Sequence, residues 1–190
     1  MKKIIIKALF QNKYALRIKY IGKNSKVGLL HNILNGKYIS IGDNTSIGRY
    51  SRLHCYDKYN GIVLHPKIEI GNNCIFGSNL TIISADLIRI EDNVAFAGYV
   101  TLVNENHGID VENTLPYYKQ SLTTSAIIVG EGSWIGERCC ILSGVSIGKK
   151  CIVGSGSVVT KSIPDYSIAV GNPAKVIKSW NFEKHKWDEV

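Results

Sequence analysis

The segment around His107 combines the residue type and the position that proton-transfer chemistry requires. The chain has five histidines, and His107 alone stands where a regular repeat stops and a long irregular segment, residues 104–126, begins. A neutral imidazole in such a place can take a proton from a hydroxyl or amine that attacks a thioester. The alternative is a structural role, in which His107 is an exposed loop residue held by hydrogen bonds. The local sequence leaves both interpretations open.

A strict six-residue repeat occupies residues 129–164, after the irregular segment. Its steps each begin with Val or Ile: VGEGSW, IGERCC, ILSGVS, IGKKCI, VGSGSV and VTKSIP. A period of six matches neither an α-helix, at about 3.6, nor a strand, at about 2. It is typical of β-solenoids in which each hexad forms one short face of a coil. Looser copies of the repeat precede His107 within residues 41–52, 70–87 and 90–101.

Each hexad position has a physical role in such a coil. The opening aliphatic residue points inward and stacks on its equivalents about 4.8 Å away in neighbouring coils. Glycine at the second position suits an unusual backbone angle at the corner. Asn and Asp at the third and fourth positions suit turns. The fifth position holds a small residue that fits beside the stack, as in this series: Ser133, Cys139, Val145, Cys151 and Ser157. The pattern predicts an all-β, parallel β-helix.

The repeat also predicts the domain organisation. A chain of 190 residues is one domain by length. We expect a basic N-terminal cap segment over residues 1–36, a β-helix domain over 37–170 with the excursion loop 104–126, and a C-terminal tail over 171–190. A break between Ser51 and Ile68 indicates a short insertion within a coil. The tail is expected to be a short helix or an extended cap.

Charge is concentrated at the start of the chain. The net charge is +8, and residues 1–42 hold nine Lys or Arg and no Asp or Glu, whereas the remainder has 14 basic and 15 acidic residues. Such a block can contact an anionic membrane or glycolipid, or it can be a solvated cap over the first coil. No nucleic-acid-binding motif accompanies it, so nucleic acid is not expected as a partner.

Composition limits location and metal chemistry. No apolar run is long enough to span a bilayer. The start, MKKIIIKALFQNK, is expected to be mature sequence because Lys7 interrupts its apolar stretch. The five cysteines are odd in number and lack paired spacing, which favours neither disulfides nor zinc. A reducing cytoplasm follows, with membrane association through the basic segment as a possibility.

Four segments carry a resemblance to a known family: IGNNCIFGSNLTI, IEDNVAFAGYVTLVNENHG, VGEGSWIGERCCILSGVSIG and VGSGSVVTKSIPDYSIAVGNPAKVIK. Over roughly residues 68–178 the chain resembles the hexapeptide-repeat, left-handed β-helix acyltransferases, within the galactoside, maltose and nodulation-type sugar O-acetyltransferase group. The resemblance implies left-handed coils and a homotrimer. It implies acetyl-CoA as co-substrate, in a groove between neighbouring chains, with no tightly bound cofactor. The family's catalytic histidine corresponds to His107 in TLVNENH.

The resemblance also implies a set of donor-binding residues. Trp134 corresponds to a tryptophan near the pantetheine of coenzyme A. Thr160 and Lys161 match a pair at the adenosine end. Lys175 and Lys178 stand where the family has arginines near the phosphates, and lysine keeps the charge but loses the bidentate fork. Backbone groups that would hydrogen-bond the pantetheine amides lie around Ser143, Gly144, Ser155 and Gly156.

Two departures from the family concern the acceptor. Gly77 stands where the family often has an asparagine that helps the acyl carbonyl or the acceptor. We expect Asn79, Asn104 or Asn106 to compensate. The acceptor-binding region of the small-sugar enzymes is not recognisable in residues 1–40, which favours the envelope-polysaccharide members of the group.

The sequence therefore predicts acetyl transfer from acetyl-CoA to a sugar hydroxyl of a polysaccharide or its precursor. His107 would act as general base in a direct transfer without an acyl-enzyme. Alternatives are N-acetylation of an amino-sugar nucleotide, acetylation of serine or an antibiotic, and a non-catalytic solenoid scaffold. A metal-dependent hydratase would need three histidines on zinc, and the spacing of His54, His65 and His107 does not favour such a site.

Overall fold

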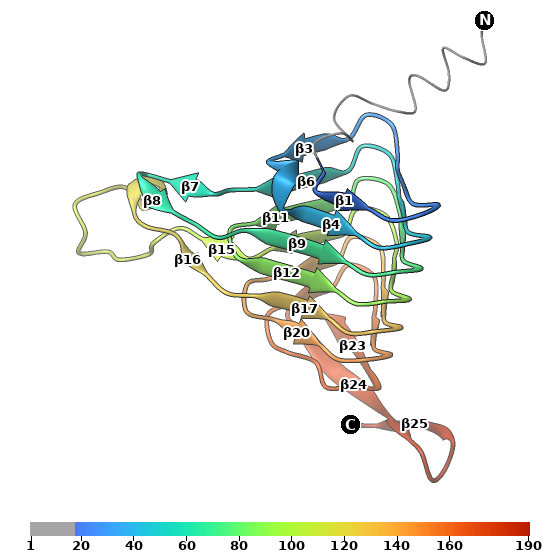
Figure 1. The fold of residues 1–190 in the computed structure, drawn as a ribbon. Coiled ribbons are helices and arrows are strands. Elements are labelled where there is room, and N and C mark those ends of the chain that lie inside the picture. Colours follow the sequence, from blue (N-terminus) through green and yellow to red (C-terminus); the bar gives the residue numbers. More distant parts are fainter. Residues whose placement is uncertain (1–17) are drawn as a thin grey trace, which may run out of the picture.

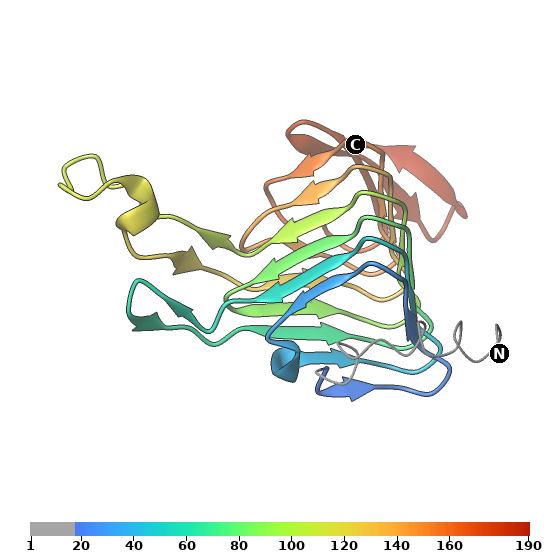
Figure 2. The same ribbon diagram turned by 90° about the horizontal axis from the view of Figure 1, so that it is seen from above.

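The computed structural model describes residues 18–190, which form a three-sided solenoid of short parallel strands (Figure 1). Within that range there is no α-helix. Consecutive strands lie on the first, second and third sheets in turn, and the next strand returns to the first sheet. Seen from above in Figure 2, the chain turns counter-clockwise as it moves away from the viewer, so the coils are left-handed. The predicted all-β fold is confirmed.

The first sheet contains β1 (Tyr20–Ile21), β4 (Ile39–Ile41), β9 (Lys67–Ile70), β12 (Leu87–Ile90), β17 (Ile127–Val129) and β20 (Ser146–Ile147). The second sheet contains β2 (Lys26–Val27), β5 (Ser46–Ile47), β10 (Ile75–Phe76), β13 (Ala95–Phe96), β18 (Trp134–Ile135), β21 (Ile152–Val153), β23 (Ser167–Gly171), β24 (Ala174–Asn181) and β25 (Lys186–Glu189). The third sheet contains β3 (Asn32–Leu34), β6 (Arg52–Cys55), β11 (Thr81–Ser84), β14 (Thr101–Val103), β19 (Cys140–Ile141) and β22 (Val158–Val159).

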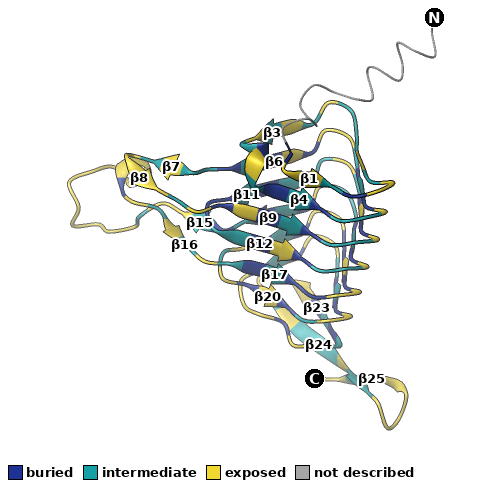
Figure 3. Ribbon diagram, viewed as in Figure 1, coloured by how far each residue is buried: buried dark blue, intermediate teal, exposed yellow. Residues whose placement is uncertain are grey.

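The core is a set of ladders built from the opening residues of the hexads. In the third sheet, Leu53, Ile82 and Leu102 lie in register and are fully buried. In the second sheet, the rings of Phe76 and Phe96 meet edge to face with centroids 5.0 Å apart. Figure 3 shows buried segments recurring from coil to coil, whereas the segments that project from the solenoid are largely exposed. Because every inward side chain stacks on its neighbours above and below, no coil buries its apolar face alone.

At the corners, the second and fourth hexad positions have different backbone roles. This corrects the expectation that the second-position glycine has the unusual backbone angle. The second-position glycines are needed for close stacking: a Cβ on Gly48 would lie 2.5 Å from the Gly77 carbonyl carbon. The left-handed residue is instead the fourth of the hexad, for example Asn44 (φ 56°) and Asn73 (φ 55°). Asparagine tolerates this conformation better than most residues, as the sequence indicated.

At the corner between the first and second sheets, most fifth hexad positions form a ladder of side chains that hydrogen-bond to the next coil, and Val94 is the apolar exception. The Thr45 hydroxyl donates to the Gly71 carbonyl at 2.8 Å, and the Ser133 hydroxyl donates to the Gly148 carbonyl at 2.8 Å. The Cys151 thiol occupies the equivalent place and donates to the Pro164 carbonyl at 3.0 Å. Small residues are required here because the side chain must fit between backbones and still reach a carbonyl.

We expect Cys151→Ser to be tolerated, because the new hydroxyl takes the place that Ser133 takes in the coil before it. The free energy of unfolding should change by less than about 1 kcal/mol. Urea unfolding followed by circular dichroism measures it. Cys151→Leu is the matched control and should be clearly less stable, because the ladder has no room for the larger side chain. Equal stability of the two variants would contradict this account.

The solenoid begins earlier than residue 37, which corrects the predicted domain boundary. Strand β1 pairs with β4 and β2 pairs with β5, so a complete coil already exists over residues 20–34. The hexads IGKNSK and VGLLHN, residues 21–32, carry this coil, and the 3-10 turn η2 (Gly36–Tyr38) lies at the corner that follows. The expectations for the very start of the chain concern residues 1–17 and lie outside the described residues.

The C-terminal tail is extended and contains no helix, which decides between the two expected forms. Strand β24 runs antiparallel to β23, and β25 runs antiparallel to β24. Trp180 and Trp187 face each other across this last pair with ring centroids 5.3 Å apart. No helix among the described residues is long and apolar enough to cross a bilayer.

Candidate active site

Two excursions leave the solenoid at the corner between the third and first sheets. The first fills the predicted break after β6 and forms the hairpin of β7 (Lys58–Tyr59) and β8 (Ile62–Val63). The second is the predicted excursion loop, with β15 (Glu105–Asn106) antiparallel to β16 (Thr123–Thr124) and the 3-10 turn η3 (Tyr117–Lys119) farther out. Figures 1 and 2 show both projecting on the same side, and they touch where Tyr59 and Asn60 of the hairpin contact the Tyr118 carbonyl.

His107 lies where the two excursions meet. It follows β15 directly, and its side chain is exposed. Its Nδ1 is 3.3 Å from the Tyr59 hydroxyl oxygen, and the two ring centroids are 5.4 Å apart. The Tyr59 hydroxyl also donates to the Tyr118 carbonyl, which accepts a second hydrogen bond from the Asn60 side-chain amide at 3.3 Å. The imidazole is therefore held on one side and open on the other.

The base of the excursion loop is fixed by Asn104, whose side chain is fully buried. Its Oδ1 accepts from the Ala85 backbone N–H at 2.9 Å, and its Nδ2 donates to the Leu87 carbonyl at 3.2 Å. The Asn104 carbonyl in turn accepts from the Ser143 hydroxyl at 3.0 Å. The expectation that Asn104 contacts the acceptor is therefore wrong, because its amide is already engaged inside the protein. It anchors the strand that carries His107.

The outer part of the loop is held together by Gln120, which is only 4% exposed. Its side-chain oxygen accepts from the Asp110 backbone N–H at 3.1 Å, and its amide donates to the Leu115 carbonyl at 3.1 Å. A Cβ on Gly108, beside His107, would lie 2.6 Å from the Cβ of Gln120. The loop is thus packed on itself and leaves a hollow of about 480 Å³, lined by residues between Asp110 and Tyr117.

The other two asparagines have different surroundings. Asn79 has a left-handed backbone (φ 61°) at the corner between the second and third sheets, so a single chain does not bring it to His107. Asn106 is exposed in β15, paired with Thr123 and adjacent to His107 in sequence. Of the three proposed acceptor contacts, only Asn106 remains available beside His107 within one chain.

Seven of the nine donor-binding residues expected from the resemblance lie on three parts of one chain. Ser143, Gly144, Thr160 and Lys161 are on the corner between the third and first sheets, the corner that carries His107. Trp134 points outward from the second sheet and is 56% exposed, between Ala95 and Ile152 in register. Ser155 and Gly156 are at the corner between the second and third sheets. Within one chain, the residues of the first group thus share a corner with His107, whereas Trp134, Ser155 and Gly156 lie elsewhere.

The two lysines expected near the phosphates are on β24, beside the second sheet. Lys175 is exposed. The Lys178 ammonium lies 2.8 Å from the Glu189 carboxylate, which is 77% exposed. An ion pair this exposed contributes little to stability, so Lys178 can exchange Glu189 for a phosphate at small cost.

The cysteines are poor nucleophiles. Burial raises the pKa of the Cys55 thiol to about 12. Burial is also the main cause of the raised pKa of the other four thiols, Cys74, Cys139, Cys140 and Cys151. A thiol must ionise to attack a carbonyl. These environments therefore favour direct transfer over a cysteine-bound intermediate.

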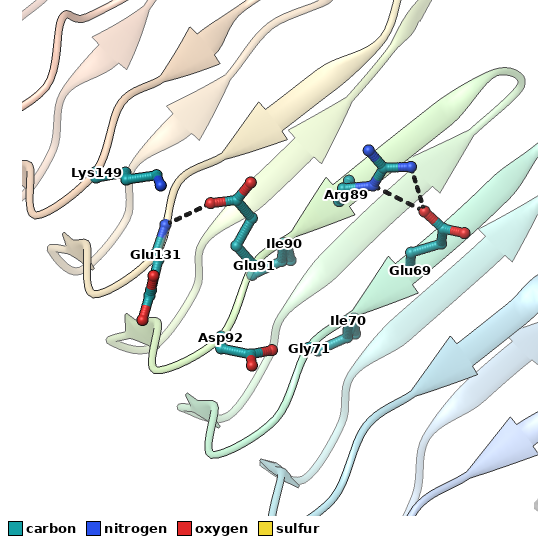
Figure 4. A pocket seen from close by; sticks show the side chains of 9 residues that line it. All are labelled: Glu69, Ile70, Gly71, Arg89, Ile90, Glu91, Asp92, Glu131 and Lys149. Atoms are coloured by element: carbon teal, nitrogen blue, oxygen red, sulfur yellow. Dashed lines mark hydrogen bonds and ion pairs between the residues drawn. The ribbon is translucent and has the colours of Figure 1, made fainter.

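A second hollow, of about 460 Å³, lies on the first sheet at its corner with the second. Figure 4 shows Arg89 paired with Glu69, and the Glu91 carboxylate accepting from the Glu131 backbone N–H at 2.9 Å. None of the expected site residues lines it. Among residues 18–190, no group of His, Cys, Asp or Glu is arranged to hold a metal ion.

Sequence reasoning missed the β7–β8 hairpin and with it Tyr59. Its turn residues Asn60 and Gly61 both have positive φ, 46° and 86°. An Asn-Gly pair between short apolar stretches is a strong hairpin signal, and it is present in YNGIV. The hairpin was therefore predictable, but its contact with His107 was not.

Comparisons with known proteins agree with this fold. The family described as bacterial transferase hexapeptide (six repeats) matches residues 126–161. A probable acetyltransferase of Mycobacterium tuberculosis is 38% identical over 134 residues, which cover 70% of this chain and 43% of that protein. A putative lipopolysaccharide biosynthesis O-acetyl transferase of Escherichia coli is 29% identical over 83% of this chain and 80% of its own length. The chain thus spans less than half of the mycobacterial relative.

Solved structures share the architecture. An N-acyltransferase from Bacillus cereus, AntD, in complex with dTDP-4-amino-4,6-dideoxyglucose and coenzyme A, superposes with a TM-score of 0.74. It is 21% identical, and the match covers 97% of this chain and 91% of that one. The solved structures therefore show the left-handed solenoid fold. Within that fold, residues 126–161 are similar to the hexapeptide-repeat transferase family.

Proposed function

We propose that this chain transfers the acetyl group of acetyl-CoA to a hydroxyl of a sugar in a polysaccharide or its precursor. The observation that carries the proposal is the setting of His107, exposed at the corner where two excursions meet beside the six matched repeats. The E. coli relative, described as an O-acetyl transferase of lipopolysaccharide biosynthesis, supports an oxygen acceptor. A cytoplasmic location belongs to the same proposal.

The proposed reaction is one direct transfer. The free nitrogen of His107 removes the proton of the acceptor hydroxyl, and the oxygen attacks the thioester carbonyl carbon. Backbone N–H groups stabilise the negative charge that develops on the carbonyl oxygen. The carbon–sulfur bond then breaks, and the imidazolium returns its proton to the coenzyme A thiolate. The products are the acetyl ester and free coenzyme A.

The distribution of the donor-binding residues supports a homotrimer. Trp134 and Ser155 do not share a corner with His107 in one chain, so a groove that used all three would need walls from two chains. Under this proposal acetyl-CoA lies between neighbouring chains, with Lys175 and Lys178 at its phosphate end.

The basic start of the chain supports contact with an anionic surface. Lys19, Lys23, Lys26 and Lys37 are all exposed on the first coil, at the end of the solenoid. Positive charge at one end would hold the enzyme near an anionic membrane or glycolipid. The other five basic residues of the block lie outside the described residues.

We expect acetyl-CoA to raise the melting temperature of the protein. A ligand at about 100 times its Kd stabilises the folded state by about 2.7 kcal/mol. Differential scanning fluorimetry with acetyl-CoA measures the shift, and Trp134→Ala should reduce it. Tyr50→Ala, at an exposed corner position, is the control and should leave it unchanged. An unchanged melting temperature in the wild-type protein would favour the non-catalytic scaffold.

The experiment that tests the reaction is product analysis with a panel of nucleotide sugars and glycan precursors. Mass spectrometry detects the added acetyl group, and mild alkali separates esters, which are cleaved, from amides, which survive. We expect an alkali-labile product. An alkali-stable product on an amino-sugar nucleotide would replace the O-acetyl proposal with N-acetylation, for which the same histidine could serve as base.

A further inference from the structure

The Tyr59 hydroxyl lies between two polar groups from the other excursion. It contacts Nδ1 of His107 at 3.3 Å and the carbonyl oxygen of Tyr118. A carbonyl oxygen can only accept a hydrogen bond, and a tyrosine hydroxyl has only one proton to donate. That proton is therefore directed to Tyr118, and the hydroxyl oxygen is left to accept from His107.

This arrangement determines the tautomer of His107. If the Tyr59 oxygen accepts, Nδ1 of the neutral imidazole must carry the proton. In a neutral ring only one nitrogen is protonated, so Nε2 keeps its lone pair. Nε2 then faces away from the hairpin and is the nitrogen free to take a proton.

The hairpin that supplies Tyr59 is itself firmly attached to the coil. Asp57, at its base, accepts hydrogen bonds from the Tyr38 hydroxyl at 3.0 Å and from the Asn35 side chain at 3.3 Å. The Lys37 ammonium is 3.2 Å from the same carboxylate. Asp57 also accepts, through its carbonyl, from the Leu64 N–H at 3.0 Å, which closes the hairpin. Tyr59 is thus presented by a short element with a fixed base and a tight turn.

We propose that Tyr59 is a positioning residue for His107, holding the imidazole in the Nδ1–H tautomer so that Nε2 acts as the base. The inference rests on the proposed function, because it needs His107 to be that base. It assigns a role to the first excursion: a hairpin from one coil orients the catalytic side chain on a loop from another. The contact joins residues 48 positions apart in the chain.

Tyr59→Phe tests the inference, because it removes the hydroxyl and keeps the ring that packs against His107. We expect kcat to fall about 5- to 20-fold, as for the loss of one hydrogen bond that matters in the transition state. The KM for acetyl-CoA should change by less than about twofold, because Tyr59 is not among its expected contacts. Nitrogen-15 NMR of the neutral imidazole should show Nδ1–H in the wild-type protein and a shift toward Nε2–H in the variant.

Tyr56→Phe is the matched control. Tyr56 also has its hydroxyl near a histidine, 3.5 Å from Nδ1 of His54, and among the described residues its side chain makes no hydrogen bond to the excursion loop. It should keep wild-type kcat and leave the His107 signals in place. An equal loss of kcat in both variants would overturn the inference.

The failure of the inference can be told from the failure of the proposed function. If His107→Ala is inactive but Tyr59→Phe keeps full kcat, the role of Tyr59 is overturned. An unchanged His107 tautomer in Tyr59→Phe would overturn that role too, even with a lower kcat. Full activity in His107→Ala would overturn the proposed function itself. A loss of kcat together with the tautomer change, in Tyr59→Phe alone, is the result that supports the inference.

Discussion

His107→Ala is expected to lower kcat by about 10²- to 10⁴-fold, the usual contribution of a general base. The variant keeps all the expected donor-binding residues, so the affinity for acetyl-CoA should stay near the wild-type value. His107 is exposed and makes one side-chain hydrogen bond among the described residues, to Tyr59, so its removal should not unfold the loop. Steady-state kinetics with acetyl-CoA and the best acceptor of the panel measures both parameters.

The control for this variant is His65→Ala. His65 is also an exposed histidine, and it lies in the segment of the first excursion that leads back to the first sheet. Its replacement should leave kcat within about twofold of wild type, because no described contact links it to the excursion loop. Near-full activity in His107→Ala would show that another group removes the proton and would refute the assignment of the base.

Asn104→Ala is expected to lower the free energy of unfolding by about 2–3 kcal/mol, which is the cost of leaving buried polar groups without partners. The substitution removes the partners of the Ala85 N–H and the Leu87 carbonyl in a fully buried site. It also loosens the strand that leads to His107, so kcat should fall as well. Chemical unfolding and kinetics on the same preparation measure the two effects.

Asn104→Asp refines this prediction because it nearly conserves shape. One carboxylate oxygen can still accept from Ala85, but the other replaces a donor and faces the Leu87 carbonyl, so the variant should also be destabilised. Asn106→Ala, two residues farther along, is the matched control and should change stability by less than about 0.5 kcal/mol. A stable Asn104→Ala protein would mean that the anchor is not needed.

The repeat was enough to predict the class of fold but not all its boundaries. The hexads from Val129 to Pro164 predict stacked parallel strands because an aliphatic residue every six positions can be buried only in a short-faced coil. The first coil, around Tyr20 to Leu34, was not predicted, although its hexads IGKNSK and VGLLHN follow the same period. The second-position glycines were expected for their backbone angle, whereas close stacking of neighbouring coils requires them.

The sequence by itself determined the solenoid, the position of the excursion and the place of His107 at its start. These are local properties, set by the spacing of neighbouring residues along the chain. Only the tertiary structure decided that Asn104 is a buried anchor and that Tyr59 reaches His107. Such contacts depend on which coils carry insertions and on how far each projects from the corner. The six-residue period gives no information about these contacts, because they join irregular segments that lie on different coils.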